Sequence, residues 1–588
     1  MSLDSASSQR NAPSYTPTHT VQITGRRWAV AAGHPLAAAA AARLLQAGGN
    51  AIDAGVAGGL CLGVVHPDMV SFAGVAPVLV HLARTRETWQ VSGVGPYPRA
   101  VTLEYFRDRH RGEIPPGVPR TVVPAAPAAW LTALARWGTM SFADVVAPAL
   151  ECAERGFPIS RFTAHQMAGQ EATYRQWPTS AALFLRDGRP LRAGEILVQS
   201  ELAQTIRAMT RAEAAAGGGR VAGVRAARDA FYRGDPARAI AAFHRANGGL
   251  LAYDDLASFD VEVAPALRTT FHAYEVAACG FWCQGPVLLQ MLNLLEGDDL
   301  GALGHNSPAY LHRLVETIKL AFADREAYYG DPLYVKVPAE GLLSKAYARA
   351  RRALIREGAA WPTMPPAGDP DRTAPVRAGA RQDGPTPASV PPAHSLDTSY
   401  VAVVDADGNA FSATPSDFSV DGPVVPGVGC VVSPRGSQGW LDPAHPSVVA
   451  PGKRPRLTPA PAMAFRGGAL LMPFGTPGGD VQQQAMLQVF LNVAVFGLSI
   501  QDAIEAPRVA SRSFPDSFWP HPIAPGKLEV EGRIPAATRA ALGALGHEVS
   551  AWPDWEWRAG GVCGVLVDRT GARRAGVDPR RGCHAIAW

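Results

Sequence analysis

The 588-residue sequence lacks several features that would assign it to a common class of protein. It contains no dense run of lysine and arginine, and its formal net charge is only +4. Electrostatic capture of nucleic acid or of an anionic membrane is therefore not expected. The sequence also contains no P-loop, HExxH or GxSxG motif, although Gly436-Ser437-Gln438-Gly439 falls one residue short of the last of these. Chemistry based on these three motifs is not indicated.

Cysteine is scarce, with seven residues scattered along the chain. An odd number in a chain of this length indicates buried thiols rather than a disulfide framework. Cys279 and Cys283 have CxxxC spacing, which differs from a redox CxxC, and no further Cys or His pair lies nearby at zinc-ligand spacing. We therefore expect neither a metal nor a cofactor.

No secretory signal or membrane-spanning segment is recognisable. Residues 1–25 are polar and rich in Ser, Thr and Pro, without the basic start and continuous apolar core of a signal peptide. The alanine-rich stretch 37–47 contains Arg43 and is too short to cross a bilayer. The sequence predicts a disordered N-terminal segment over residues 1–25 and a cytoplasmic location.

The composition, 47% hydrophobic and 18% charged, is that of a globular protein with a large core. Helical patterns alternate with short valine-rich strands up to about residue 160, and mainly helical patterns continue to residue 356. Residues 357–397 are dense in Pro, Gly, Ala and Arg, which indicates a linker. We predict a large segment over residues 26–356, this linker, and a strand-rich small segment over residues 398–588.

Thr398 opens the first predicted strand after the linker. An apolar run from Val401, the turn Asp407-Gly408-Asn409 and a second apolar run predict a hairpin. An N-terminal nucleophile hydrolase needs a hydroxyl residue directly after a cleavable stretch. Cleavage of the Asp397–Thr398 bond would give Thr398 an α-amine with a pKa of about 8, able to act as base for its own Oγ. The structural alternative is a threonine that merely begins a strand.

Two consecutive glycines, Gly478 and Gly479, lie between an apolar run and a helical pattern that begins near Val481. Backbone N–H groups at the start of a helix lie at the positive end of its dipole and can stabilise an oxyanion. An ordinary tight turn is the structural alternative.

With Thr398 and the glycine pair, the sequence resembles the gamma-glutamyltransferase family of N-terminal nucleophile hydrolases. Further matching motifs, spread over nearly the whole chain, are GGNAIDA at residues 48–54, HP at 66–67, ADR at 323–325, GDP at 330–332, GKRP at 452–455 and EAPR at 505–508. The resemblance implies an α/β (α+β) fold, a four-layer αββα sandwich in which residues 26–588 form one interleaved domain. It also implies a precursor cut into two segments that remain together as a heterodimer.

The resemblance further implies roles for individual residues. Thr398 would be nucleophile and base, the Asp397–Thr398 bond the processing site, and Gly478 and Gly479 the oxyanion donors. Ser416 stands eighteen residues after Thr398, where the family has a threonine that bonds the amine of the nucleophile. A turn serine is the structural alternative for Ser416.

The chain departs from the family at the residues that bind the glutamyl group. Val94 lies in the strand where the family has a carboxylate-binding arginine, and Phe418 and Gln438 replace an asparagine and an aspartate. Thr458 keeps one hydroxyl of a family serine pair. Loss of a bidentate arginine and a carboxylate from a buried site weakens recognition strongly. We expect the chemistry to be retained and the glutamyl pocket to be lost.

Arg435 and Arg456 lie near the altered pocket and could hold a carboxylate of a different acyl group, with a structural role as the alternative for each. The sequence thus predicts an autoprocessed threonine amidohydrolase for a small, non-glutamyl amide, such as an oxamate-type compound, a dicarboxylic monoamide or a cephalosporin-acylase-type side-chain amide. A glutathione hydrolase or transpeptidase is the alternative within the family. An unprocessed, non-catalytic binding protein is the alternative from another class.

Overall fold

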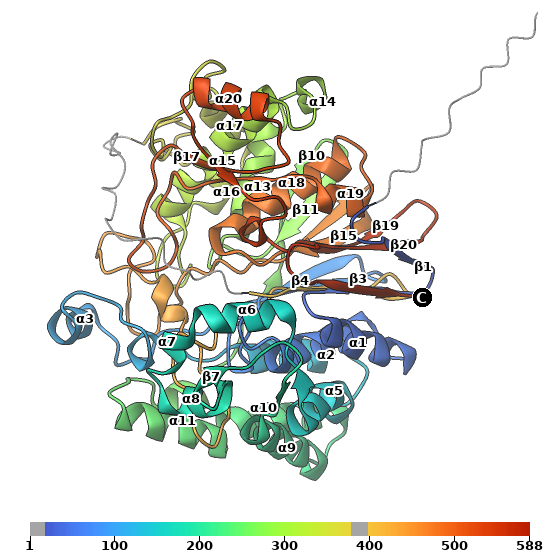
Figure 1. Ribbon diagram of the computed structural model, residues 1–588, viewed down its shortest axis with the longest axis vertical. Helices are drawn as coiled ribbons and strands as arrows, with labels where there is room; N and C mark the ends of the chain where they lie inside the picture. Colours follow the sequence, from blue (N-terminus) through green and yellow to red (C-terminus); the bar gives the residue numbers. More distant parts are fainter. Residues whose placement is uncertain (1–17, 378–397) are drawn as a thin grey trace, which may run out of the picture.

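The computed structural model describes residues 18–377 and 398–588 (Figure 1). Predictions for the first 17 residues, for residues 378–397 and for Asp397 lie outside the described residues, and the cytoplasmic location stays a prediction. In the two described ranges, no helix combines the length and the apolar character needed to cross a bilayer.

Two seven-stranded antiparallel sheets form the centre of the molecule (Figure 1). The strands of the first sheet, in spatial order, are β1 (Ile23–Gly25), β20 (Arg573–Val577), β19 (Cys563–Val567), β15 (Ala469–Gly475), β14 (Ala462–Arg466), β11 (Tyr274–Ala278) and β10 (Leu267–Phe271). Those of the second are β21 (His584–Ala587), β2 (Ala29–Ala32), β12 (Val401–Val404), β13 (Ala410–Ala413), β3 (Val78–Leu82), β4 (Glu87–Val91) and β9 (Val263–Pro265). Each sheet contains strands from both sides of the Asp397–Thr398 bond, so the two segments are interleaved.

Side chains of β12 alternate between two cores. Ala402 and Val404 lie in the apolar cluster between the sheets, together with Met463 of β14. Val401 and Val403 point the other way, into the cluster formed with the helices. Because both faces of the strand are buried, its sequence reads as a continuous apolar run.

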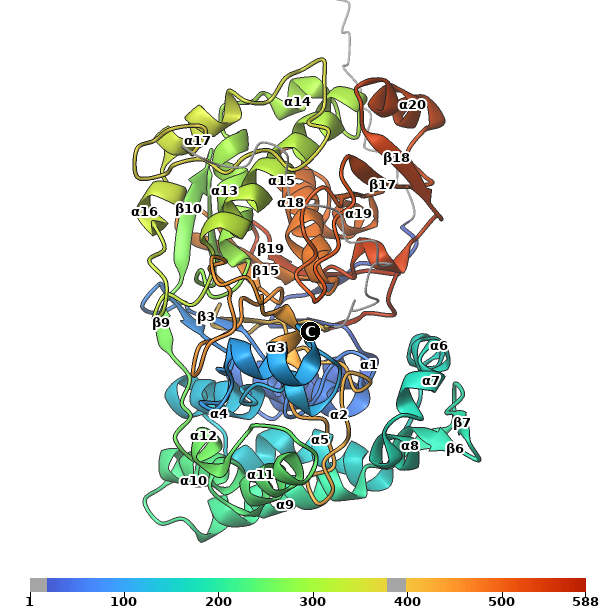
Figure 2. The ribbon, with the colours of Figure 1, turned by 90° about the vertical axis from the view of Figure 1, so that its left-hand side faces the viewer.

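Helices cover the outer face of each sheet (Figures 1 and 2). The cluster on the second sheet includes α1 (Pro35–Gln46), α2 (Ala51–Val65), α4 (Ala126–Trp137), α5 (Phe142–Arg155), α9 (Ser200–Ala215) and α10 (Arg220–Tyr232). The cluster on the first sheet includes α13 (Gly285–Leu295), α15 (Pro308–Tyr328), α18 (Gln482–Ala494) and α19 (Ile500–Glu505). The predicted αββα sandwich is confirmed.

Shorter elements surround these four layers. A three-stranded sheet consists of β16 (Val509–Ser511), β17 (Lys527–Glu531) and β18 (Glu548–Trp552), with α20 (Ala536–Ala544) between its last two strands. Peripheral helices include α3 (Leu103–His110), α6 (Arg161–Gly169), α7 (Glu171–Tyr174), α8 (Pro178–Phe184), α11 (Asp235–Ala246) and α17 (Lys345–Arg352).

The GGNAIDA motif builds the start of α2 and its close contact with the sheet. Asn50 caps the helix and forms a capping box with Asp53. A Cβ on Gly55 would lie 2.1 Å from the ring of Phe411, so only glycine allows β13 to pack this closely on the helix. Asp405, in the predicted hairpin turn, accepts a bond from the N–H of Ala51 at 2.9 Å. The motif therefore positions the hairpin that follows Thr398.

Parts of the predicted disordered N-terminal segment and of the predicted linker are packed against the rest of the protein. β1, at the end of the N-terminal segment, pairs with β20. In the linker, the carbonyls of Pro366 and Pro375 accept hydrogen bonds, at 2.8 and 2.6 Å, from the buried guanidinium of Arg351 in α17. The sequence reading missed this packing because composition does not reveal a distant arginine that bonds proline carbonyls.

Candidate active site

Thr398 lies buried just before β12, with 1% of its surface exposed. Its backbone N–H donates to the carbonyl of Met69 at 3.0 Å, in the turn that follows the HP motif. Its φ is +107°, a region that β-branched residues rarely adopt. Such backbone strain persists only where the surroundings enforce it, and it is found most often at functional positions.

The hydroxyl of Thr398 lies 2.8 Å from the hydroxyl of Ser416. Ser416 is fully buried, and its N–H donates to the carbonyl of Val75 at 3.0 Å. The structure thus brings these two predicted site residues together at hydrogen-bonding distance.

A buried ion pair stands behind Ser416. Arg435, in the short 3-10 helix η2 (Arg435–Gln438), donates through Nη2 to Ser416 Oγ at 2.6 Å and through Nε to Asp417 Oδ1 at 2.7 Å. Ser433 donates its hydroxyl to the other carboxylate oxygen of Asp417. Asp417 has a φ of +100° and is fully buried. The sequence reading missed Asp417, because nothing local marks a turn aspartate as the partner of an arginine eighteen residues later.

The glycine pair joins β15 to the 3-10 helix η3 (Gly479–Val481) and α18. The φ angles are +128° at Gly478 and +57° at Gly479, so both residues adopt left-handed conformations that favour glycine. Gln284 donates to the carbonyl of Gly479 at 3.0 Å. The turn is therefore fixed from within the protein and can present its N–H groups in one orientation.

Asp480, directly after the glycines, is anchored by the ADR motif. Its carboxylate forms a buried ion pair with Arg325 of α15. It also accepts from the N–H and the hydroxyl of Ser517, each at 2.7 Å. A helix of the large segment thus holds the glycine turn of the small segment.

Arg581 is a further cation beside these groups. Its Nε donates to the carbonyl of Trp557 at 2.8 Å, and Nη1 lies 3.8 Å from the sulfur of Met69. Its Nη2 would lie 3.9 Å from a Cβ added to Gly478. The guanidinium therefore stands between the glycine turn and the turn that holds the Thr398 N–H. Sequence reasoning missed it, because only the pairing of β21 with β2 brings this part of the chain to the site.

Two titratable residues of the turn after α2 are shifted by their surroundings. Burial, and to a smaller extent the Arg581 charge, lowers the pKa of His66 to about 3, so its ring is neutral at pH 7. Burial raises the pKa of Asp68 to about 7, although the nearby Thr163 side chain, its own backbone N–H and, to a smaller extent, the Arg581 charge oppose the shift. A buried carboxylate of this kind is a frequent feature of functional sites.

The remaining predicted pocket residues are buried, and two of them are bonded to each other. Gln438 donates to the hydroxyl of Thr458 at 2.9 Å. Arg456 pairs with Glu326 at 3.0 Å, next to Arg325 in the ADR motif. Phe418 is 8% exposed. Like Arg435, Arg456 already binds a carboxylate of the protein.

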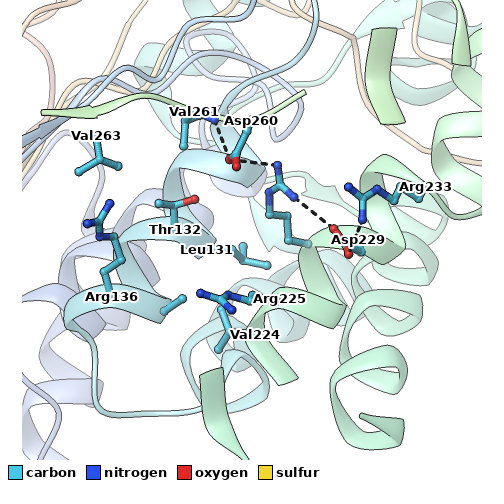
Figure 3. Close-up of a pocket in the computed structure, with 12 residues that line it drawn as sticks. Leu131, Thr132, Arg136, Val224, Arg225, Asp229, Arg233, Asp260, Val261 and Val263 are labelled. Carbon is cyan, nitrogen blue, oxygen red and sulfur yellow. Dashed lines mark hydrogen bonds and ion pairs between the residues drawn. The ribbon is translucent and has the colours of Figure 1, made fainter. Parts of the chain in front are cut away.

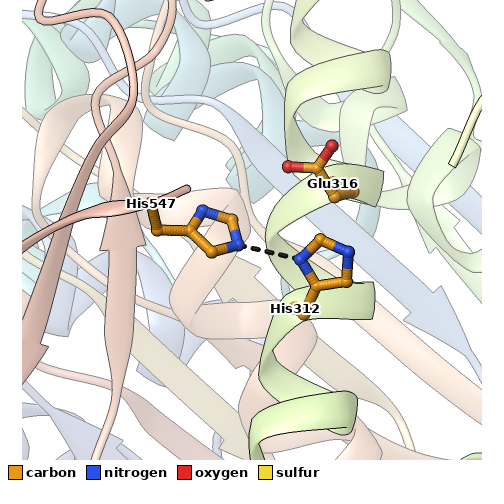
Figure 4. Close-up of side chains that lie close together, drawn as sticks. All are labelled: His312, Glu316 and His547. Carbon is orange, nitrogen blue, oxygen red and sulfur yellow. Dashed lines mark hydrogen bonds between the residues drawn. The ribbon is translucent and has the colours of Figure 1, made fainter. Parts of the chain in front are cut away.

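One group of side chains has the composition of a metal site: His312, Glu316 and His547 (Figure 4). In the structure, the two imidazoles are hydrogen-bonded at 2.9 Å. The carboxylate of Glu316 accepts from Lys319 Nζ at 2.8 Å and from the N–H of Trp361 at 3.0 Å. A divalent ion there would face a buried ammonium, with only one carboxylate to compensate both charges. These contacts explain the cluster without a metal.

A cavity of about 530 Å³ lies on the outer helices α4 and α10 (Figure 3). Within it, Arg228 is bonded to Asp229 and Asp260, and Arg233 is bonded to Asp229. It contains none of the residues predicted for catalysis.

Comparison with known proteins gives matches over nearly the whole chain. Residues 37–588 match the gamma-glutamyltranspeptidase family model. The Acylase ACY 1 proenzyme of Pseudomonas sp. (strain SE83) is 34% identical over 545 residues, which cover 90% of this chain and 88% of the relative. The glutathione hydrolase-like YwrD proenzyme of Bacillus subtilis (strain 168) is 31% identical over 569 residues, covering 96% and 99%. The crystal structure of a cephalosporin acylase from Bacillus halodurans superposes with a TM-score of 0.83 at 29% identity, covering 98% of this chain and 99% of that one.

Proposed function

This chain belongs to the gamma-glutamyltranspeptidase family, and we propose that it is an autoprocessed amidohydrolase whose nucleophile is Thr398. Its relatives are acylase and glutathione hydrolase proenzymes, which supports an amide-cleaving enzyme made from a single precursor. The observation that carries the assignment to Thr398 is its buried hydroxyl, bonded to Ser416 at 2.8 Å in a strained backbone conformation.

Maturation then proceeds by attack of Thr398 Oγ on the carbonyl carbon of Asp397. The C–N bond breaks, the nitrogen takes up the hydroxyl proton, and an ester links Asp397 to the threonine. Water hydrolyses this ester and leaves Thr398 with a free α-amine, which is the base of the mature enzyme. Each later turnover repeats the sequence on a substrate amide: the amine takes the proton of Oγ, an acyl ester forms, the substrate amine leaves, and water releases the acid.

The N–H groups at Gly478 and Gly479 are proposed to stabilise the oxyanion of both tetrahedral intermediates. The fixed left-handed turn supports this role, since a donor that needs no reorganisation stabilises developing charge best. The Arg325–Asp480 pair holds the turn in place.

We propose that the acyl group is small, acidic and non-glutamyl. Val94 and Phe418 offer no polar atom to an amino-acid head group, and Gln438 is bonded to Thr458. A carboxylate on the acyl group needs a cation. Arg435 and Arg456, predicted from the sequence, each hold a carboxylate of the protein. Arg581 lies beside the proposed oxyanion turn, with Nη2 3.9 Å from a Cβ that would be added to Gly478, and this position is the reason that we propose Arg581 as the residue that receives the acid.

A panel of amides tests this specificity. We expect oxamate, succinamate, glutaramate or a glutaryl amide to give a higher kcat/KM than glutathione and γ-glutamyl-p-nitroanilide. A tenfold advantage of the γ-glutamyl compounds would instead establish the second candidate function, a glutathione hydrolase, which the 31% identity to the YwrD relative favours.

A further inference from the structure

The hydroxyl of Thr398 stands at the end of a chain of buried polar contacts. Thr398 Oγ1 lies 2.8 Å from Ser416 Oγ, which lies 2.6 Å from Arg435 Nη2. Arg435 in turn bonds Asp417 through Nε at 2.7 Å and Nη2 at 2.6 Å. All four residues are at most 1% exposed. We call this chain, Asp417–Arg435–Ser416, the relay.

We propose that Asp417 and Arg435 are positioning residues that act through Ser416 to direct the proton of the Thr398 hydroxyl. This inference rests on the proposed role of Thr398 as nucleophile. It assigns Arg435 to the nucleophile rather than to a substrate carboxylate.

The direction of the hydrogen bonds follows from the chemistry of the groups. A guanidinium can only donate, so its bond to Ser416 uses a lone pair of the serine oxygen. The serine hydrogen is then available for Thr398 Oγ1, and a cation behind the serine makes it a stronger donor. Such a donor stabilises the alkoxide character that Oγ1 acquires when its own proton leaves for the α-amine.

Asp417 keeps the guanidinium in this orientation. Both Nε and Nη2 of Arg435 bond its carboxylate, and a buried cation without this partner would be costly. The hydroxyl of Ser433 holds the second carboxylate oxygen. Aspartate at a φ of +100° is an unfavourable choice for the backbone alone, so the carboxylate accounts for the residue better than the turn does.

Other charged and titratable groups lie on both sides of the relay. Asp421 faces Arg435 and pairs with Arg120 at 3.5 Å. On the other side, Arg581 is the cation near the Thr398 backbone, with the neutral His66 and the shifted carboxyl of Asp68. A change at Asp417 or Arg435 therefore alters the local charge by one unit, in opposite directions.

Opposite charge changes give a test that a merely structural role would not pass. In Arg435→Gln, loss of the cation should raise the pKa of the Thr398 amine and move the acid limb of kcat/KM to higher pH. In Asp417→Asn, the uncompensated cation should move the same limb to lower pH. We expect shifts of roughly half a pH unit each, with about a tenfold or greater loss of kcat.

Three further variants complete the experiment. Arg435→Lys keeps the charge and should keep the acid limb in place while kcat falls. Asp417→Asn should add little to the loss already present in Ser416→Ala, because both act on the same hydroxyl. Asp298→Asn is the control: it removes the carboxylate that pairs with Arg313, at 2.6 Å, and with Arg352, and it should leave the pH profile unchanged.

The outcomes separate the relay from the proposed function. Unshifted acid limbs in both Arg435→Gln and Asp417→Asn, or full additivity with Ser416→Ala, would overturn the relay while Thr398 remained the nucleophile. Processing and activity in Thr398→Ala would overturn the proposed function itself. If Asp417→Asn fails to fold, Ser433→Ala loosens the same carboxylate more gently and should shift the limb in the same direction; no shift there counts against the relay.

Discussion

Each of the two sides of the candidate site is supported by its own buried arginine–aspartate ion pair. One pair fixes a backbone turn, and the other contacts a side-chain hydroxyl. On the oxyanion side, Arg325 of α15 binds Asp480 and so fixes a backbone turn. On the nucleophile side, Arg435 binds Asp417 and also touches the Ser416 hydroxyl. The first pair joins the large and small segments, whereas the second lies within the small segment. In our proposal, the oxyanion side thus depends on the contact between the two segments, and the nucleophile side depends on the placement of single protons.

The largest effect should come from breaking the oxyanion-side pair. Arg325→Gln leaves Asp480 buried with only Ser517 as partner, and loss of one member of a buried pair costs about 3–5 kcal/mol. We expect this loss in urea-unfolding free energy together with undetectable turnover. Arg435→Lys, which keeps a charge beside Asp417, is the comparison and should lose much less stability. Equal losses in the two variants would remove the distinction between the sides.

The next effect concerns the glycine turn. Gly478→Ala introduces a side chain at a φ of +128°, where the added Cβ meets its neighbours at ordinary van der Waals distances of 3.6 Å and more but the backbone conformation is strained. Turnover should fall by about a hundredfold or more, the scale of losing one oxyanion donor. Gly479→Ala, at a φ of +57°, should be less affected because this angle is nearer to a region that L-residues adopt. Wild-type kcat in a folded Gly478→Ala protein would show that the turn is not an oxyanion site.

The next effect concerns substrate selection and is confined to acidic substrates. Arg581→Met should lower kcat/KM for an acidic amide such as succinamate by roughly 2–4 kcal/mol in transition-state binding. It should change the value for the neutral analogue butyramide far less. Arg456→Met, at the arginine that pairs with Glu326, should keep the preference for the acid. If Arg456→Met loses that preference and Arg581→Met keeps it, the carboxylate partner is the one predicted from the sequence.

The smallest effect is a pH dependence of stability on the nucleophile side. Asp68 has a folded-state pKa raised from 3.8 to about 7, so the folded protein binds more protons than the unfolded chain between these values. Its contribution to stability is present below pH 3.8 and is lost as the pH rises through 7. Asp68→Asn should therefore be more stable than wild type, and this difference in unfolding free energy should be larger at pH 7.5 than at pH 5 by about 1 kcal/mol or more. A difference independent of pH would show that Asp68 is ionised throughout.

Sequence alone predicted the fold class and the family, because these rest on local or strongly patterned signals. The Asp-Gly turn after Thr398 and the apolar runs around it produce the hairpin of β12 and β13. The eighteen-residue spacing of Ser416 from Thr398 survives in space as a 2.8 Å contact.

The missed residues could not be found from the sequence for a common reason. Their roles depend on contacts with residues that are remote in the chain, and no local sequence pattern marks these contacts. Arg581 reaches the site only because the last strand pairs with β2. In the sequence, Asp68 looks like an ordinary aspartate in a turn, and only its burial in the folded protein distinguishes it. The roles of Arg435 and Arg456 depend on which carboxylates lie beside them in the folded protein, and this cannot be deduced from a sequence pattern.

The most direct test of the central claim is the state of the Asp397–Thr398 bond in purified protein. Intact-mass measurement and N-terminal sequencing should find two fragments of about two thirds and one third of the 62.0-kDa chain, the smaller beginning at Thr398. Thr398→Ala should remain a single chain without amidase activity, and Thr398→Ser should be cut. An uncut wild-type chain that hydrolyses amides at full rate would contradict the assignment of Thr398 as an N-terminal nucleophile.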